Sequence, residues 1–494
     1  MKTAIKSIIL GTLVLVASCR NKDLMDPKPT TSIPDINAFD TPDKVLSQVR
    51  ALYANLKGGQ FYGGRYLIYN DIRAEEFLNE LTNGVTALQT WNHSLTNTVA
   101  EVNGLWAQGF YTINTCNVFL DGMTAKGTSV VGDALSKNYT AEARLIRALS
   151  YYSLLQLYAR PYWDGNGGKD GLPLRLVGNK TSGDYKLARS TVAQIYDQIF
   201  TDINYAETNL PVTYSTAALN TTRAHRNTAI ALKTRIYLSM RKYPEAVTEA
   251  NKIVSATAPF TATSGVNHSL QADITNVFKS PYTTTESIFS LPMSSTSGDN
   301  PGTQNQLGYY YSPTAANGGV GNGEYSLNPT GIIGDAYFTT ADKRRTAFVK
   351  SSGTTTIKYW LTKYAAASPY TDYVPVIRYS EVLLNLAEAK VRANNAVDAQ
   401  SLALLNAVHQ RSDPATTLAP ATVADFITAI LKERRIEFLG EGLRSPDLLR
   451  LGLTIPGKST TSGSAPAVQS TDKAYIWPIS STELDLNKLC VDNN

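Results

Sequence analysis

The densest group of charged residues lies between residues 433 and 450. Glu433, Glu437 and Glu441 follow one another at intervals of four, which places their carboxylates on one face of a helix. Two carboxylates in an open cleft could serve a glycoside hydrolase as acid and as base or nucleophile. We favour ion pairs that lock a scaffold, because arginines lie in the same stretch. These are Arg434, Arg435, Arg444 and Arg450, and we interpret Arg378, Glu381 and Glu388 in the same way.

Other residue types that carry chemistry are too scattered to form a site. His93, His225, His268 and His409 have no metal-ligand spacing such as HExxH. The glycine-rich stretch 318–323 has no preceding strand, no following helix and no Lys-Ser/Thr, so we interpret it as a loop that does not bind phosphate. We expect no catalytic residue, no metal and no cofactor.

Cys19 has the most informative surroundings of any residue. It follows the small residues Ala17 and Ser18, which end an apolar run that starts behind Lys2 and Lys6. About ten apolar residues are too few to span a bilayer. A basic start, an apolar middle and small residues at the cut are typical of a secretory signal. A cysteine at the cut resembles the bacterial lipobox, so we expect a lipid on Cys19; the alternative is an ordinary signal with an incidental cysteine.

The remaining composition fits an exported, well-packed protein. Without Lys2 and Lys6 the chain has 44 basic and 41 acidic residues, which gives no reason to expect a nucleic-acid partner. Cys116 and Cys490 allow one disulfide bridge, but the apolar pattern around Cys116 favours a buried free thiol.

Apolar spacing predicts a mainly helical body. The predicted helices span 41–56, 102–123, 141–159, 192–210, 228–240, 243–254, 376–393, 396–410 and 423–441. Two stretches rich in Gly and Tyr interrupt them, and we expect short strands near 287–291 and 355–360. The segments 228–254 and 376–410 resemble helix pairs of the tetratricopeptide type.

The boundaries follow from these patterns. We expect a signal peptide at 1–18, a proline-containing tether at 19–36 and a single domain at 37–494. The helical scaffold covers about 37–57, 98–255 and 374–494. The irregular insertions cover about 58–97 and 256–373.

Five blocks in order resemble the SusD/RagB family of outer-membrane lipoproteins from Bacteroidetes. The resemblance covers nearly all of the mature chain, behind the lipobox. The blocks are Glu142–Ala148 with Tyr151-Tyr152, Leu157-Tyr158 and Pro161; the helix pair Ala231–Ala246; Pro375–Leu384 with Ala387–Ala389; Glu433–Phe438 with Gly440–Arg444, Asp447-Leu448 and Arg450; and Trp477–Ser480 with Glu483-Leu484 and Asn487.

The resemblance implies a SusD-like fold, with tetratricopeptide-like helix pairs as scaffold and irregular insertions as the ligand face. It implies non-catalytic capture of an oligosaccharide or polysaccharide at the outer membrane. The partner would be a SusC-like TonB-dependent transporter. The tether begins basic, Arg20 to Lys22, where surface lipoproteins of this group often carry acidic residues. The family nevertheless favours the outer face of the membrane.

The ligand residues should lie in the two insertions. Sugars present apolar ring faces edged by hydroxyls, which aromatic rings cover and polar side chains bond. Trp91 is the first candidate, because a tryptophan in a polar segment has little obvious core to join. Of three consecutive tyrosines, Tyr309 to Tyr311, we expect at least one to be exposed. The full set is Trp91, Tyr309, Tyr310, Tyr311, Asp71, Arg73, Asn92, Tyr62 and Tyr66.

Three alternatives stay open at this point. A RagB-like member of the same architecture would bind peptide. A glycoside hydrolase would need two facing carboxylates in an open cleft. A pure helix-repeat scaffold would bind no small ligand.

Overall fold

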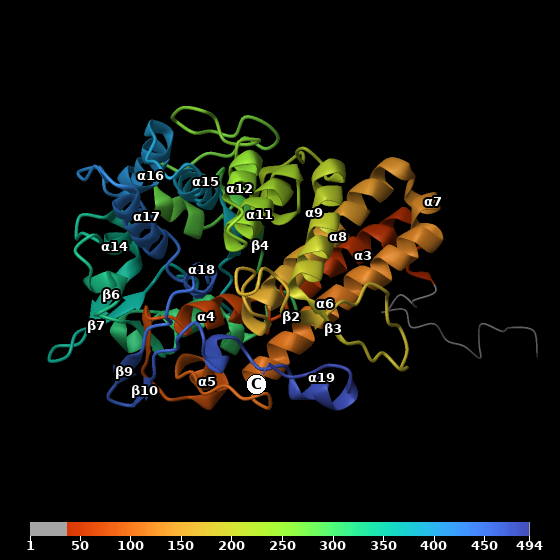
Figure 1. Ribbon diagram of the computed structural model, residues 1–494, viewed down its shortest axis with the longest axis horizontal. Coiled ribbons are helices and arrows are strands. Elements are labelled where there is room, and N and C mark those ends of the chain that lie inside the picture. The colour runs from red at the N-terminus through yellow and green to blue at the C-terminus, as the bar shows by residue number, and fades with distance from the viewer. Residues whose placement is uncertain (1–36, 494) are drawn as a thin grey trace, which may run out of the picture.

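The structure, a computed structural model, describes residues 37–493, so the predicted signal, Cys19 and the predicted tether lie outside the described residues. Helices make up nearly half of the described chain and strands only a small part of it (Figure 1). The long ones are α3 (Pro42–Leu56), α6 (Ala100–Gly122), α8 (Asp133–Tyr158), α9 (Val192–Asn209), α11 (Arg226–Ser239), α12 (Tyr243–Ala250), α15 (Tyr379–Asn394), α16 (Ala399–Ser412) and α17 (Val423–Glu437).

Consecutive helices pack as neighbours, as the apolar spacing predicts. Contacts join α3 to α6, α6 to α8, α8 to α9, α11 to α12 and α15 to α16. In Figure 1, α3, α6, α8 and α9 lie on one side, α15 to α17 on the other, and α11 and α12 between them. The prediction of a mainly helical body with helix pairs is confirmed.

Helix α3 shows how the sequence fixes a boundary locally. Thr41 accepts a hydrogen bond from the N–H of Lys44, Pro42 occupies the first turn, and Val45, Val49 and Leu52 are buried on one face. Helix α8 begins at Asp133, eight residues before the predicted start. Its first turns are mostly exposed and polar, so they carry no apolar pattern that could have predicted them.

One predicted helix start is wrong for a clear reason. Val374–Arg378 forms strand β8, which pairs antiparallel with β4 (Ser287–Leu291), so the helix begins at Tyr379 and not at Val376. Valine and isoleucine suit a strand, and Pro375 disfavours a helix. The predicted strand at 287–291 is confirmed, and the one at 355–360 lies at β7 (Lys358–Leu361).

A four-stranded antiparallel sheet joins the two insertions. Its order is β1 (Phe77–Asn79), β5 (Tyr325–Leu327), β7 and β6 (Val349–Ser352). Strand β1 comes from the first insertion and the other three from the second. The first insertion also contains helix α4 (Arg65–Ile72), whereas the sequence predicts an irregular segment there.

Short elements complete the chain. They are α5 (Leu88–Trp91), α7 (Thr128–Val131), α10 (Ala217–Thr222), α13 (Leu307–Tyr311), α14 (Lys343–Phe348), α18 (Arg444–Leu451), α19 (Ser481–Leu486), and the strand pairs β2 (Asp170–Pro173) with β3 (Arg189–Thr191) and β9 (Lys458–Thr460) with β10 (Gly463–Ala465).

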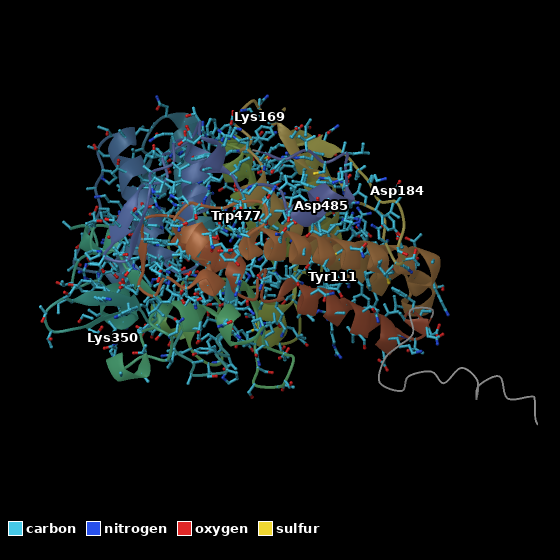
Figure 2. All side chains as sticks on the ribbon, turned by 90° about the horizontal axis from the view of Figure 1, so that it is seen from below. Tyr111, Lys169, Asp184, Lys350, Trp477 and Asp485 are labelled. Atoms are coloured by element: carbon cyan, nitrogen blue, oxygen red, sulfur yellow. The ribbon has the colours of Figure 1, made fainter. Side chains whose placement is uncertain are left out.

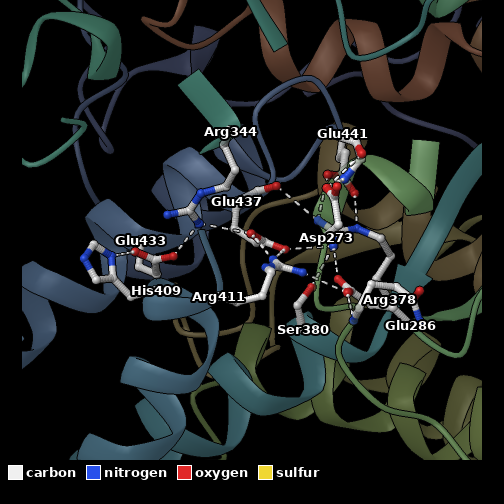
Figure 3. A network of polar contacts seen from close by, with 12 residues as sticks. Asp273, Glu286, Arg344, Arg378, Ser380, His409, Arg411, Glu433, Glu437 and Glu441 are labelled. Carbon is white, nitrogen blue, oxygen red and sulfur yellow. Dashed lines mark hydrogen bonds and ion pairs between the residues drawn. The ribbon is translucent and has the colours of Figure 1, made fainter. Parts of the chain in front are cut away.

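Ion pairs lock α17 to its neighbours (Figure 3). Glu437 accepts from Arg378 at 2.8 Å, from Arg411 at 2.7 Å and from Arg344 at 3.0 Å, and all four side chains are at most 4% exposed. Because these guanidinium groups outweigh the effect of burial, the pKa of Glu437 lies well below its usual value. The prediction that the charges at 433–441 pair within the scaffold is confirmed.

Cys116 and Cys490 are both free and buried. Burial raises the pKa of the Cys116 thiol to about 12. The two cysteines therefore form no bridge in this structure, and Cys116 packs as a small apolar residue.

Candidate ligand face

The fold brings residues of the two insertions together at the centre of the molecule. Tyr311 donates its hydroxyl to Asp71 at 3.0 Å, and the N–H of Gly442 donates to the same oxygen at 2.9 Å. Tyr311 also stacks on Phe77 at 4.8 Å. Asp71 and Tyr311 were both predicted to contact a ligand, and the structure places them against each other in the core.

Seven of the nine predicted ligand residues are buried. These are Tyr62, Tyr66, Asp71, Arg73, Trp91, Tyr310 and Tyr311, none more than 6% exposed. Tyr62 and Tyr66 line a cavity of about 30 Å³, which has room for a single water molecule and not for a sugar ring. In this conformation these rings present no platform to a ligand.

Trp91 corrects the reasoning that singled it out. The expectation that it lacks a core is wrong, because it is 1% exposed and its Nε1 donates to the carbonyl of Phe77 at 2.9 Å. The buried Lys458 ammonium lies 5.4 Å from the centre of its ring. The segment around Trp91 is polar in sequence, but β1, 14 positions earlier, and β9, far away in the chain, enclose it.

Tyr309 and Asn92, the other two predicted ligand residues, are only partly buried. The Asn92 side chain accepts from the N–H of Ser94 at 3.1 Å and from its hydroxyl at 2.6 Å, so it stabilises its own turn. Tyr309 is half-buried at the surface of α13 and lies edge-on to Tyr370 at 5.9 Å. The expectation that one of the three consecutive tyrosines is exposed is thus not met in full, because Tyr310 and Tyr311 are buried and Tyr309 is half-buried.

Tyr309 belongs to a group of rings at the surface of the second insertion. Tyr282 and Tyr373 are half-buried and stack at 4.7 Å with an angle of 18° between their planes. Tyr370 lies three residues before Tyr373, is buried at 6% exposed, and packs edge-on behind Tyr309. We call the three half-buried rings Tyr282, Tyr309 and Tyr373 the tyrosine face.

Polar groups border the tyrosine face. Asp299 accepts from Lys57, and this bond lowers the pKa of Asp299 against the opposing effect of partial burial. The carboxylate also acts on the Tyr373 hydroxyl electrostatically. The buried Arg65 of the first insertion joins it to the second, since Arg65 donates to the carbonyl of Gln304 at 3.2 Å. Rings with a polar border are what a sugar requires.

Sequence reasoning missed Tyr282, Tyr370 and Tyr373. Tyr370 and Tyr373 lie in Ser-Pro-Tyr-Thr-Asp-Tyr, a polar stretch like the one that made Trp91 a candidate. The stacking of Tyr282 on Tyr373 joins residues 91 positions apart and left no signal in the sequence. Among residues 37–493 no cluster of His, Cys, Asp and Glu could hold a metal ion.

Comparisons with known proteins agree with this architecture. Residues 350–494 match the family model of the SusD family, and residues 25–238 match the one described as starch-binding associating with outer membrane. A SusD superfamily protein from Bacteroides fragilis shares 31% identity and a TM-score of 0.79 over 92% of this chain and 99% of its own. The chain belongs to the SusD superfamily.

Other SusD superfamily structures show the same fold at lower identity. One from Bacteroides thetaiotaomicron has 23% identity and a TM-score of 0.78 over 92% of this chain and all of its own. Surface glycan-binding protein A of the same organism, in complex with laminarihexaose, has 20% identity and a TM-score of 0.72, covering 92% and 99% of the two chains. No curated protein matches the sequence. The resemblance in the ordered blocks and the SusD-like fold are thus confirmed.

Proposed function

We propose that this SusD superfamily protein captures an oligosaccharide or polysaccharide at the cell surface. The observation that carries the proposal is the tyrosine face, with its stacked Tyr282 and Tyr373 and the half-buried Tyr309. Such rings cover the apolar face of a sugar, and the surrounding amides and carboxylates bond its hydroxyls. A superfamily relative in complex with laminarihexaose supports a glycan as cargo.

Membrane attachment is part of the same proposal. In the described part of the chain, no helix is long and apolar enough to cross a bilayer. Cleavage after residue 18 and a lipid on Cys19 would hold the body at the outer membrane, through residues 19–36. The family model described as starch-binding associating with outer membrane begins at residue 25 and supports this location.

The partner we propose is a SusC-like TonB-dependent transporter, which would receive the captured glycan. The resemblance of the whole mature chain to SusD-like proteins supports this partner. Co-purification of the detergent-solubilised lipoprotein with such a barrel from its own host tests the association. Recovery of the lipoprotein without any barrel would contradict it.

The role we propose is binding without catalysis. Glu433 and Glu437, the carboxylates with hydrolase-like spacing, are fully buried and bound by arginines. Their pKa values lie below the usual range, because the guanidinium groups outweigh the effect of burial. A general acid needs a raised pKa and access to substrate, and these groups have neither.

Glycan binding is tested by calorimetry with the purified lipoprotein against starch, laminarin, xylan, mannan and host glycans. We expect saturable heat with at least one glycan, and no released sugar after prolonged incubation. Saturable binding of peptides alone would favour the RagB-like cargo. Sugar release that is lost on mutating one surface carboxylate would favour a hydrolase, and no binding at all would favour a pure scaffold.

A further inference from the structure

A second pocket lies away from the tyrosine face, between the end of α4, α5 and the C-terminal segment. It has a volume of about 200 Å³, and Arg73, Thr90, His93 and Lys473 contribute to its wall. At about 30 Å³ per water molecule, this space corresponds to roughly six waters. It therefore has room for a small polar ligand.

Two buried polar groups of this wall have no partner within the protein. Arg73 is 2% exposed, and its Nη2 donates to the carbonyl of Ala474 at 2.7 Å, but its Nη1 bonds to nothing. The Thr90 hydroxyl is fully buried and also unpartnered. A buried donor without a partner costs about 1–3 kcal/mol, and more when it is charged. Arg73 and Thr90 are both residues of the wall of the same cavity.

The charge of Arg73 is not balanced by a carboxylate. Among the ion pairs of residues 37–493, none includes Arg73 or its buried neighbour Lys458. The nearby Glu75 and Glu76 are held by Arg444 and Arg435. Burial lowers the pKa of Arg73 to about 10, so the guanidinium still carries its charge at neutral pH. Lys473, at the exposed rim, adds a further positive charge.

His93 holds this arrangement in place. Its Nε2 lies 2.7 Å from the carbonyl of Arg73, and its Nδ1 lies 2.7 Å from that of Pro466. Burial, together with Lys458 and Arg73, lowers the pKa of His93 to about 4. The ring is thus neutral at pH 7, so it carries one N–H, donates to only one of these two carbonyls and adds no charge to the pocket.

We propose that this pocket binds a carboxylate, held by Arg73 Nη1, the Thr90 hydroxyl and Lys473. One guanidinium nitrogen and one hydroxyl, both donors, match the two oxygens of a carboxylate. A larger cleft of about 610 Å³ shares Lys473 and Ile476 with the pocket and gives a route of entry. The site does not depend on the proposed glycan capture at the tyrosine face.

Calorimetry and thermal shift with sodium acetate, sodium glucuronate and glucose test the site at constant ionic strength. We expect acetate and glucuronate to bind and glucose not to bind. Tighter binding of glucuronate than of acetate would identify the ligand as an acidic sugar, and equal affinity would identify it as a free organic acid. Equal response to all three, or to chloride, would overturn the proposal.

Variants separate the pocket from its surroundings. Thr90→Val and Lys473→Ala should each weaken glucuronate binding by about tenfold, the equivalent of one charge-assisted hydrogen bond. Lys169→Ala, in the neighbouring cleft and visible at the surface in Figure 2, should have no effect. If Arg73→Gln does not fold, the glucuronate affinities of Thr90→Val and Lys473→Ala still test the site. A glucuronate-soaked crystal with only water at Arg73 Nη1 would refute the site.

Discussion

Arg450 donates from Nη1 and Nη2 to the two carboxylate oxygens of Glu388, each at 2.7 Å, and so joins α18 to α15. Neither side chain is more than 4% exposed. The pair links two of the sequence blocks that mark the superfamily. Each of the two charges compensates the cost of burying the other, so neither Arg450 nor Glu388 could be buried alone without a large loss of stability.

We predict that Arg450→Met destabilises the protein by about 3–5 kcal/mol, because it leaves Glu388 and Asp447 buried with fewer partners. Denaturant unfolding of the purified protein measures this loss. Lys126→Ala, which removes an exposed pair with Asp40, is the matched control and should cost less than about 1 kcal/mol. Equal losses in the two variants would show that burial of the pair is irrelevant.

Asp71 makes stability depend on pH. Burial raises its pKa to about 8 from the ordinary 3.8, although bonds from Gly442 and Tyr311 oppose the rise. The folded state thus keeps a proton that the unfolded chain loses near pH 4. Stability from this group is therefore complete below pH 4 and falls as the pH rises to about 8.

Asp71→Asn should remove the stability loss that Asp71 causes as the pH rises toward 8. We expect the variant to be more stable than the parent protein at pH 8, on the order of 2 kcal/mol, and no more stable at pH 4. Thermal unfolding at the two pH values measures the difference. A variant that is destabilised equally at both would mean that Asp71 is ionised in the folded protein.

Trp91→Ala should act on stability and not on ligand contact. Removing a buried indole costs about 3–5 kcal/mol and leaves the Phe77 carbonyl without its donor. At a temperature where the variant is folded, its glycan affinity should match that of the parent protein. If the variant lost glycan affinity while its free energy of unfolding stayed the same, Trp91 would have to contact the ligand.

The tyrosine face predicts a different pattern. Tyr309→Ala and Tyr373→Ala should each weaken glycan binding about threefold to tenfold, because each removes one ring from the platform. Tyr111 on α6 is 56% exposed and belongs to neither insertion (Figure 2), so Tyr111→Ala is the control. Similar affinities for all three variants would place the glycan elsewhere.

Cys19→Ala tests the anchor. We expect the variant to leave the membrane fraction and to keep the melting temperature and glycan affinity of the parent body, since Cys19 precedes the described fold. Cell fractionation followed by calorimetry measures both. Retention in the membrane fraction would contradict lipidation at this residue.

The scaffold could be predicted from sequence because its signals are local. The cap at Thr41 and the spacing of Val45, Val49 and Leu52 act within one helix. Glu433 and Glu437 likewise share α17, but that helix ends at Glu437, so the predicted helix to 441 is too long and Glu441 lies in the turn that follows. The ordered blocks were enough to indicate the superfamily. The short strand at 287–291 also follows from neighbouring residues.

The ligand face could not be predicted in this way, because exposure depends on which distant segments meet. Trp91 is enclosed by β1 and by Lys458 of β9, and Tyr311 meets Asp71 across 240 positions. Arg73 was chosen for its chemistry, but only the fold places it beside Thr90 and Lys473 in one pocket. The sequence by itself determined the helices, their ion pairs and the superfamily. The tertiary structure decided which polar and aromatic side chains face solvent, since burial is a property of contacts between segments and not of the segments themselves.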